Sequence, residues 1–138
     1  NATAIGANAT VAQSNSLILG AGGTDVGIGT TTPTANLDVN GDFALGVNGT
    51  VLTEVIKAAV TVDVVSIPAN DVVIQTFTVT NATPGSSVMI SPNGGLTNGL
   101  VLAYARVSAA NTVEVKFTNT TGAAINPANM TYYITVIR

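Results

Sequence analysis

Residues 112–118 read Thr-Val-Glu-Val-Lys-Phe-Thr. Apolar side chains at Val113, Val115 and Phe117 alternate with polar ones, which is the two-residue period of a strand with one buried face. Comparable runs flank this segment, and turn-forming residues separate them. The expected strands cover residues 60–64, 72–79, 87–90, 100–107, 112–118 and 130–137. Strands and turns at this spacing predict an all-β chain in which residues 51–138 form a jelly-roll-like β-sandwich head.

The expected strand at residues 100–107 is apolar on both faces. Strict alternation places Val101, Ala103, Ala105 and Val107 on one face and Leu100, Leu102, Tyr104 and Arg106 on the other. In a monomer one of these faces would meet water, so the pattern predicts that a subunit interface covers it. The alternative is a central strand that loops partly shield.

A short repeat precedes this region. Residues 1–6 read Asn-Ala-Thr-Ala-Ile-Gly and residues 15–20 read Asn-Ser-Leu-Ile-Leu-Gly, an offset of 14 residues. A fixed short period with glycine at the corners is typical of a β-solenoid, in which each coil stacks on the next. Two coils cannot bury a core alone, so other chains would have to cover residues 1–50. The alternative is chance similarity within an Ala/Thr/Asn-rich stretch.

The composition excludes several classes of function. The chain has 138 residues, of which 46% are hydrophobic and 8% charged, a net charge of −3, and neither cysteine nor histidine. Disulfides, thiolate or imidazole metal sites and a Ser-His-Asp triad are therefore excluded. The chain lacks the basic surface that binds nucleic acid and an apolar run long enough to insert into a membrane. We also expect a fragment or a processed product, because residue 1 is Asn and no signal peptide is visible.

Three segments resemble fibre proteins. Residues 1–10 are similar to the head repeat of trimeric autotransporter adhesins, which has a 14-residue period and forms a trimeric left-handed parallel β-roll. Residues 26–41, Val-Gly-Ile-Gly-Thr-Thr-Thr-Pro-Thr-Ala-Asn-Leu-Asp-Val-Asn-Gly, resemble a segment common in phage tail fibres and related bacterial surface fibres. Residues 60–138, with Ile-Pro-Ala-Asn at 67–70 and Gly-Leu-Val-Leu-Ala-Tyr-Ala-Arg at 99–106, resemble a module at the C-terminal ends of such proteins.

The resemblance implies an architecture and a role. The architecture is a short trimeric β-solenoid and neck over residues 1–50, followed by the β-sandwich head. The role is that of a non-enzymatic, homotrimeric fibre or spike tip on a virion surface, which attaches to a glycan or protein receptor of a host cell. Its partners would be further copies of the chain and that receptor, without a cofactor, nucleic acid or membrane insertion. The alternatives are a structural filament or capsid-decorating subunit, and a bacterial surface adhesin head on the cell surface or outside the cell.

Receptor binding is expected at loops at the tip, and the longest loops cover residues 91–99 and 119–129. Amide side chains suit hydrogen bonds to sugars, and an aromatic ring suits stacking. The candidate binding residues are Asn93, Asn98, Tyr104, Asn126 and Asn129, with Tyr133 as a second candidate for stacking.

Acidic side chains and sequons have simpler interpretations. Glu54 and Asp63 are the nearest to a catalytic carboxylate pair, but we interpret them as solvent-facing and expect no catalytic residue. The segment Asp-Val-Asn-Gly-Asp at 38–42 lacks the order of a calcium loop, so we expect a β-turn and no metal site. Glu114 and Lys116, two residues apart on one strand face, predict a weak exposed ion pair. Six Asn-x-Ser/Thr sequons, expected to be turns and surface coat, begin at Asn1, Asn8, Asn48, Asn81, Asn119 and Asn129.

Overall fold

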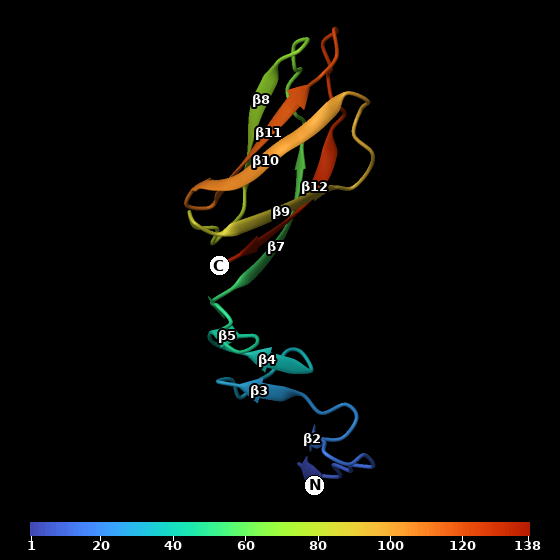
Figure 1. Ribbon diagram of the computed structural model, residues 1–138, viewed down its shortest axis with the longest axis vertical. Helices are drawn as coiled ribbons and strands as arrows, with labels where there is room; N and C mark the ends of the chain where they lie inside the picture. Colours follow the sequence, from blue (N-terminus) through green and yellow to red (C-terminus); the bar gives the residue numbers. More distant parts are fainter. The chain divides into compact units, whose positions relative to one another are not determined.

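The computed structural model covers all 138 residues and contains twelve strands and no helix (Figure 1). The prediction of an all-β chain is confirmed. The chain divides into an N-terminal unit, Asn1–Val51, and a C-terminal unit, Leu52–Arg138. None of its segments forms a helix that could span a membrane.

In the N-terminal unit, the 14-residue sequence repeat is also the register of the first strand pair. β1 (Thr3–Ile5) and β2 (Leu17–Leu19) are parallel, and each residue of β1 lies opposite the residue 14 positions later. Glycine allows the two coils to approach each other where each strand ends. Gly6 and Gly20 both have positive φ, and a Cβ on Gly6 would lie 3.2 Å from the Cα of Gly20. The sequence repeat is therefore a repeat of the backbone path.

The second strand pair is also parallel but has a shorter spacing. β3 (Val26–Ile28) lies beside β4 (Leu37–Val39), with an offset of 11 residues. Asn40 fixes the end of this pair, because its Nδ2 donates a hydrogen bond to the carbonyl of Gly29 at 3.2 Å. A further two-stranded sheet consists of β5 (Phe43–Ala44) and β6 (Val51–Leu52).

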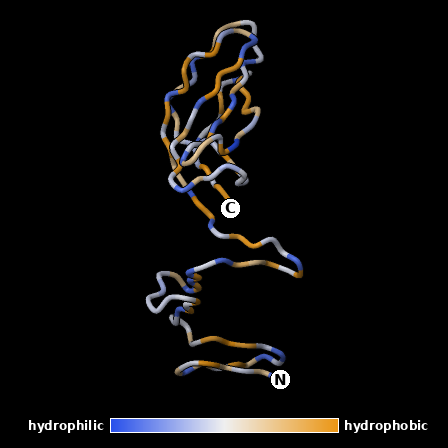
Figure 2. Tube along the Cα trace, turned by 90° about the vertical axis from the view of Figure 1, so that its left-hand side faces the viewer, coloured by the Kyte–Doolittle hydropathy of each residue, from blue (hydrophilic) through white to orange (hydrophobic).

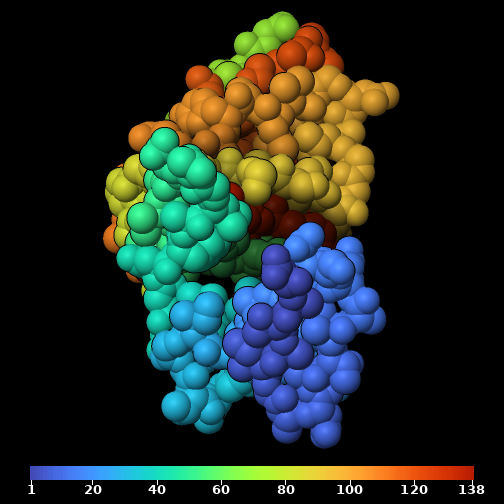
Figure 3. Space-filling view, turned by 60° about the horizontal axis from the view of Figure 1, so that its bottom comes forward, coloured from blue at the N-terminus to red at the C-terminus, as the bar shows by residue number.

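The N-terminal unit has no buried apolar side chain. Gly20 is the only buried residue among residues 1–51. Large apolar side chains are exposed instead, and the exposed fraction reaches 74% at Leu45 and 96% at Val47. The full set comprises Ile5, Leu17, Ile18, Leu19, Ile28, Leu37, Phe43, Leu45, Val47 and Val51. Figure 2 colours the hydrophobic parts of the chain orange, and Figure 3 shows the N-terminal residues from blue to cyan in a space-filling view. These coils gain almost nothing from burial within their own chain.

The C-terminal unit consists of two three-stranded antiparallel sheets. The strand order is β10-β11-β8 in one sheet and β7-β12-β9 in the other. Each strand overlaps one of the six that the sequence predicts. Their bounds are β7 (Val55–Val62), β8 (Val72–Thr78), β9 (Ser87–Pro92), β10 (Leu100–Ala109), β11 (Thr112–Asn119) and β12 (Met130–Ile137).

Both sheets contribute to one hydrophobic core. Phe77 of β8, Phe117 of β11 and Tyr132 of β12 are each at most 1% exposed. The Tyr132 ring lies edge-on to the other two, with ring centroids 5.3 Å and 5.8 Å apart. Burial raises the pKa of the Tyr132 hydroxyl. Because Tyr132 comes from one sheet and both phenylalanines come from the other, this aromatic cluster joins the two sheets.

A hydrogen bond and an ion pair join the two ends of the C-terminal unit. The carbonyl of Arg138 accepts a hydrogen bond from the N–H of Thr53 at 2.7 Å. The Arg138 guanidinium also pairs with Glu54, with Nη2 2.6 Å from Oε2. The unit thus has its own core and its own closure, and both are independent of residues 1–51.

A β-bulge changes the faces expected for β10. Leu102 lies opposite Phe117 and Tyr104 lies opposite Lys116, so Ala103 is an extra residue in the ladder. The inward side chains are Leu100, Leu102, Ala105 and Val107, and the exposed ones include Val101, Ala103, Tyr104 and Arg106. The prediction of strict alternation is therefore wrong beyond Ala103. The outer face of β10 carries Tyr104 and Arg106 beside the exposed Val101 and Ala103, so strict alternation is no longer an argument for a covering subunit.

Asparagine supplies the left-handed turns. Six asparagines have φ between 54° and 68°, namely Asn8, Asn15, Asn48, Asn70, Asn81 and Asn111. Asparagine tolerates this conformation better than other residues that carry a Cβ. Three of the sequon residues belong to this set, in agreement with their interpretation as turns. Asn119, however, is 1% exposed, so the prediction that it belongs to the surface coat is wrong.

Candidate binding surfaces

The strand connections gather three long loops at one end of the C-terminal unit. Loop 63–71 joins β7 to β8, loop 93–99 joins β9 to β10, and loop 120–129 joins β11 to β12 (Figure 1). Glu54 and Arg138 lie at the opposite end, because Ile137 at the end of β12 pairs with the first residues of β7 and β9. We refer to the end formed by the three loops as the loop end.

Four of the predicted binding residues lie at the loop end. Asn93, Asn98, Asn126 and Asn129 are exposed there, and none of their side-chain amides is hydrogen-bonded within the chain. The backbone of Asn93 is held in place, because its N–H donates to the carbonyl of Thr131 at 2.8 Å. Free side-chain amides can donate to and accept from a ligand. The fifth predicted residue, Tyr104, lies away from the loops, on the outer face of β10.

A buried amide that sequence reasoning missed organises the loop end. The Nδ2 of Asn119 donates to the carbonyls of Ile67, Pro68 and Ala123 at 2.8–3.1 Å. Its Oδ1 accepts from the N and the Oγ1 of Thr121, both at 2.8 Å. One side chain thus joins loop 63–71 to loop 120–129. Asn119 is the last residue of β11, and the alternation that places Val113, Val115 and Phe117 on the inward face continues to it. The sequence pattern could therefore have placed Asn119 inward, but only its contacts reveal its role.

Four polar side chains form a cluster on the outer face of the β10-β11-β8 sheet. The cluster, called here the quartet, consists of Tyr104, Arg106, Glu114 and Lys116. Arg106 donates to both carboxylate oxygens of Glu114, at 3.1 Å and 3.2 Å. The Tyr104 hydroxyl donates to Glu114 Oε1 at 2.7 Å, and the Lys116 ammonium lies 6.0 Å from the centre of the Tyr104 ring. The prediction of a Glu114–Lys116 pair is therefore wrong, because Arg106 takes the carboxylate.

The charges within the quartet stabilise each other. Hydrogen bonds from Tyr104 and from Arg106 lower the pKa of Glu114. The hydrogen bond to Glu114 in turn raises the pKa of Tyr104 and that of Arg106. The Glu114 side chain is only 13% exposed, whereas that of Arg106 is 61% exposed. The carboxylate is therefore largely covered by its partners, and much of the guanidinium faces solvent.

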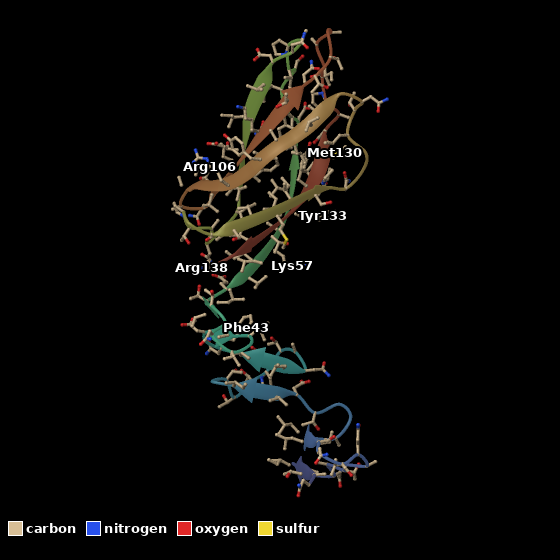
Figure 4. The ribbon with its side chains drawn as sticks, in the orientation of Figure 1. Phe43, Lys57, Arg106, Met130, Tyr133 and Arg138 are labelled. Atoms are coloured by element: carbon tan, nitrogen blue, oxygen red, sulfur yellow. The ribbon has the colours of Figure 1, made fainter.

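The outer face of the other sheet carries a second exposed tyrosine. Tyr133 of β12 lies between Ala59 and Ser91 and is 55% exposed. Lys57 is the only charged residue on the outward positions of these three strands (Figure 4). This face resembles that of the quartet in having one exposed tyrosine and one lysine, but it lacks the arginine and the carboxylate.

Outside the quartet, the acidic side chains do not form a cluster. Glu54 and Asp63 flank the eight residues of β7, so they stand roughly 30 Å apart, too far to act on one bond. Asp38 accepts hydrogen bonds from the N and Oγ1 of Thr34, at 2.9 Å and 3.0 Å. No group of three acidic side chains is placed to hold a metal ion.

Comparisons with protein-family models, curated proteins and solved structures give no match to this chain. The candidate surfaces are therefore defined by the chain's own residues: the loop end, the quartet and the face around Tyr133.

Proposed function

We propose that the chain forms the tip of a homotrimeric fibre or spike, which lies on a virion surface and attaches to a glycan or protein receptor of a host cell. The observation that carries this proposal is the N-terminal unit, where ten large apolar side chains are exposed and none is buried. Further copies of the chain would cover these side chains, and a closed symmetric assembly gives every copy the same cover. The 14-residue register equals the period of the trimeric family that residues 1–10 resemble, which favours three copies.

The finer architecture belongs to the same proposal. The parallel pairs β1–β2 and β3–β4 support a short β-solenoid with unequal coils, followed by a neck. The two antiparallel sheets with a shared core support a β-sandwich, jelly-roll-like head. In this arrangement the solenoid is stable only in the trimer, whereas the head folds in each chain.

Receptor attachment is assigned to the loop end. The loops lie at the end of the C-terminal unit opposite to the point where the chain enters it. Loops 93–99 and 120–129 contain no charged residue, and both present free asparagine amides. A neutral, amide-rich surface suits the hydroxyl groups of a sugar.

Light scattering tests the assembly. Residues 1–138 should have three times the mass of one chain, and residues 52–138 should be a folded monomer, because the core of the C-terminal unit is its own. The variant Leu17→Glu should dissociate the trimer without unfolding the C-terminal unit, and the matched variant Thr10→Glu, at an exposed polar position, should leave it intact. A monomeric mass for residues 1–138 overturns the proposal. An open polymer that grows with concentration supports the filament alternative instead.

Attachment needs a separate measurement. The labelled trimer should bind a subset of a glycan array or of purified surface proteins from candidate host cells. A variant with Ala at Asn93, Asn98, Asn126 and Asn129 should lose that binding and keep its mass and melting temperature. Binding that survives all four substitutions removes the loop end from the proposal.

A further inference from the structure

The charges of this chain are unevenly divided. The N-terminal unit holds three acids, Asp25, Asp38 and Asp42, and no base, so it carries the whole net charge of −3. The C-terminal unit holds four acids and four bases and is neutral. Two of the four bases belong to the quartet, together with one acid, which gives the quartet a net charge of +1. The charged residues of the loop end, Asp63 and Asp71, are both acidic. The quartet is therefore the part of the C-terminal unit best suited to an anion.

The geometry of the quartet leaves its positive charge accessible. Tyr104 lies opposite Lys116, and Arg106 lies opposite Glu114, so the two cations stand on one diagonal of a square and Glu114 on the other. Arg106 uses one proton each on Nε and Nη2 for Glu114, and its remaining N–H groups are free to donate. Lys116 forms no ion pair with a carboxylate, and its ammonium lies over the Tyr104 ring, 6.0 Å from the ring centre.

The quartet also has an apolar component at the same place. The Tyr104 side chain is 41% exposed, and Ile74 of β8, opposite Lys116, is 54% exposed. An aromatic ring and an aliphatic side chain on a flat sheet match the C–H face of a pyranose ring. The hydrogen bond from Tyr104 to Glu114 fixes the ring, so little conformational freedom remains to be lost on binding.

We propose that the quartet binds a saccharide that carries a carboxylate. The carboxylate lies between Lys116 and the free N–H groups of Arg106, and the sugar ring lies against Tyr104. Glu114 acts as a positioning residue, because it holds Arg106 and Tyr104 without contacting the sugar. This inference rests on the proposed attachment function and adds a second, anion-selective surface to the loop end.

Calorimetry with defined sugars tests the inference on the full chain. The probes are tri-galacturonic acid and its neutral counterpart, galactotriose. The acidic sugar should bind at least about tenfold more tightly than the neutral one, and its affinity should fall when salt rises from about 50 to about 300 mM. Lys116→Ala and Tyr104→Ala should each weaken binding at least about fivefold. Backbone amide shifts should change along β10 and β11 and not at the loop end.

The opposite sheet face provides a matched control. Lys57→Ala removes an exposed lysine from that face and should leave the affinity within about twofold. Equal affinity for the two sugars, an equal loss in the control variant, or no binding of tri-galacturonic acid overturns the inference. The trimer mass and the loop-end binding are measured separately, so failure here leaves the proposed function standing. Sugar binding by a chain that fails the mass test would instead leave the quartet as a site on a monomeric binding module.

Discussion

At the scale of single residues, the C-terminal unit depends on two polar side chains that hold their neighbours in place. Asn119 satisfies three carbonyls and two donors from a fully buried position. Glu114 accepts three hydrogen bonds at the surface. In both cases one short side chain gathers groups from separate segments. Removing it therefore leaves several polar groups without a partner, and the environment decides how much each loss costs.

The Asn119 side chain is shielded from water, so we expect its removal to lower stability strongly. Asn119→Ala should lower the free energy of unfolding of residues 52–138 by about 2–4 kcal/mol, because the carbonyls of the two loops lose their donor inside the protein. The melting temperature should fall by roughly 10–20 °C. Asn126→Ala is the matched control, since Asn126 is exposed, and should change stability by less than about 0.5 kcal/mol. Urea unfolding of both variants decides the matter, and equal midpoints would contradict the role given to Asn119.

For Glu114 the expected effect is a pH dependence. Its pKa in the folded protein is lowered, first by the hydrogen bond from Tyr104 and then by that from Arg106. The ionised form is therefore favoured by folding, so this contribution to stability is present above the ordinary glutamate pKa. It is lost as the pH falls through the folded pKa. Tyr104→Phe removes the largest cause and should move the pKa of Glu114 back toward its ordinary value.

The Glu114 titration can be followed directly. Carbon-detected NMR of the Glu114 carboxyl in residues 1–138 should show a midpoint below that of a model glutamate, and a higher midpoint in Tyr104→Phe. Tyr133→Phe alters the other exposed tyrosine and should leave the midpoint where it is. If Tyr104→Phe leaves it unchanged as well, the hydrogen bond from Tyr104 does not hold this carboxylate.

At the scale of elements, β10 shows how one extra residue sets a surface. Ala103 is one of two β10 residues, with Ser108, that the ladder with β11 does not use. Its deletion should give a strand that is regular from Leu100 to Val107, in which Tyr104 still faces Lys116 and Arg106 still faces Glu114. We expect a folded protein whose stability changes by less than about 1.5 kcal/mol. Deletion of Lys116 from β11, which has no extra residue, turns buried side chains outward and should cost more than about 3 kcal/mol. Thermal melts of the two deletions compare their stabilities, and amide spectra show whether the quartet keeps its place. An equal loss of stability in both would show that the strand needs Ala103.

β10 also contains a feature that the sequence pattern could not predict, its bulge. Alternation at residues 112–118 is enough to place β11, because every inward position is Val or Phe and every outward one is polar. In β10 small and apolar residues occupy both faces, so the pattern contains no sign of the bulge and assigns Ala105 and Val107 to the face of Val101. The 14-residue repeat predicts the register of β1 and β2, since equivalent residues lie opposite each other. No sequence repeat predicted the 11-residue spacing of β3 and β4.

The candidate surfaces were predictable only in part. Loop positions follow from turn-forming residues, so Asn93, Asn98, Asn126 and Asn129 could be assigned to loops from the sequence. Tyr104 could be named but not placed, because its neighbours on β11 depend on the register. Arg106 and Glu114 lie eight residues apart in the chain, and only the β10–β11 ladder brings their side chains together.

At the scale of the whole molecule, the two units obtain stability from different sources. Residues 52–138 bury a core from both sheets, and this burial is complete within one chain. Residues 1–51 bury only Gly20 and expose ten large apolar side chains. If copies of the chain supply the missing cover, folding of the first unit is coupled to association, and folding of the second is not.

Two thermal transitions should therefore respond differently to concentration. The transition of the C-terminal unit should stay at one temperature, and residues 52–138 alone should reproduce it. The transition of the N-terminal unit should fall on the order of 5–10 °C for a hundredfold dilution, because dilution favours separated chains. Scanning calorimetry of residues 1–138 at the two extremes of concentration gives both values, and Leu17→Glu should abolish only the concentration-dependent transition. If the temperature of the N-terminal transition does not change on dilution, the N-terminal unit is stable within one chain. The exposed apolar side chains would then be no argument for a trimer.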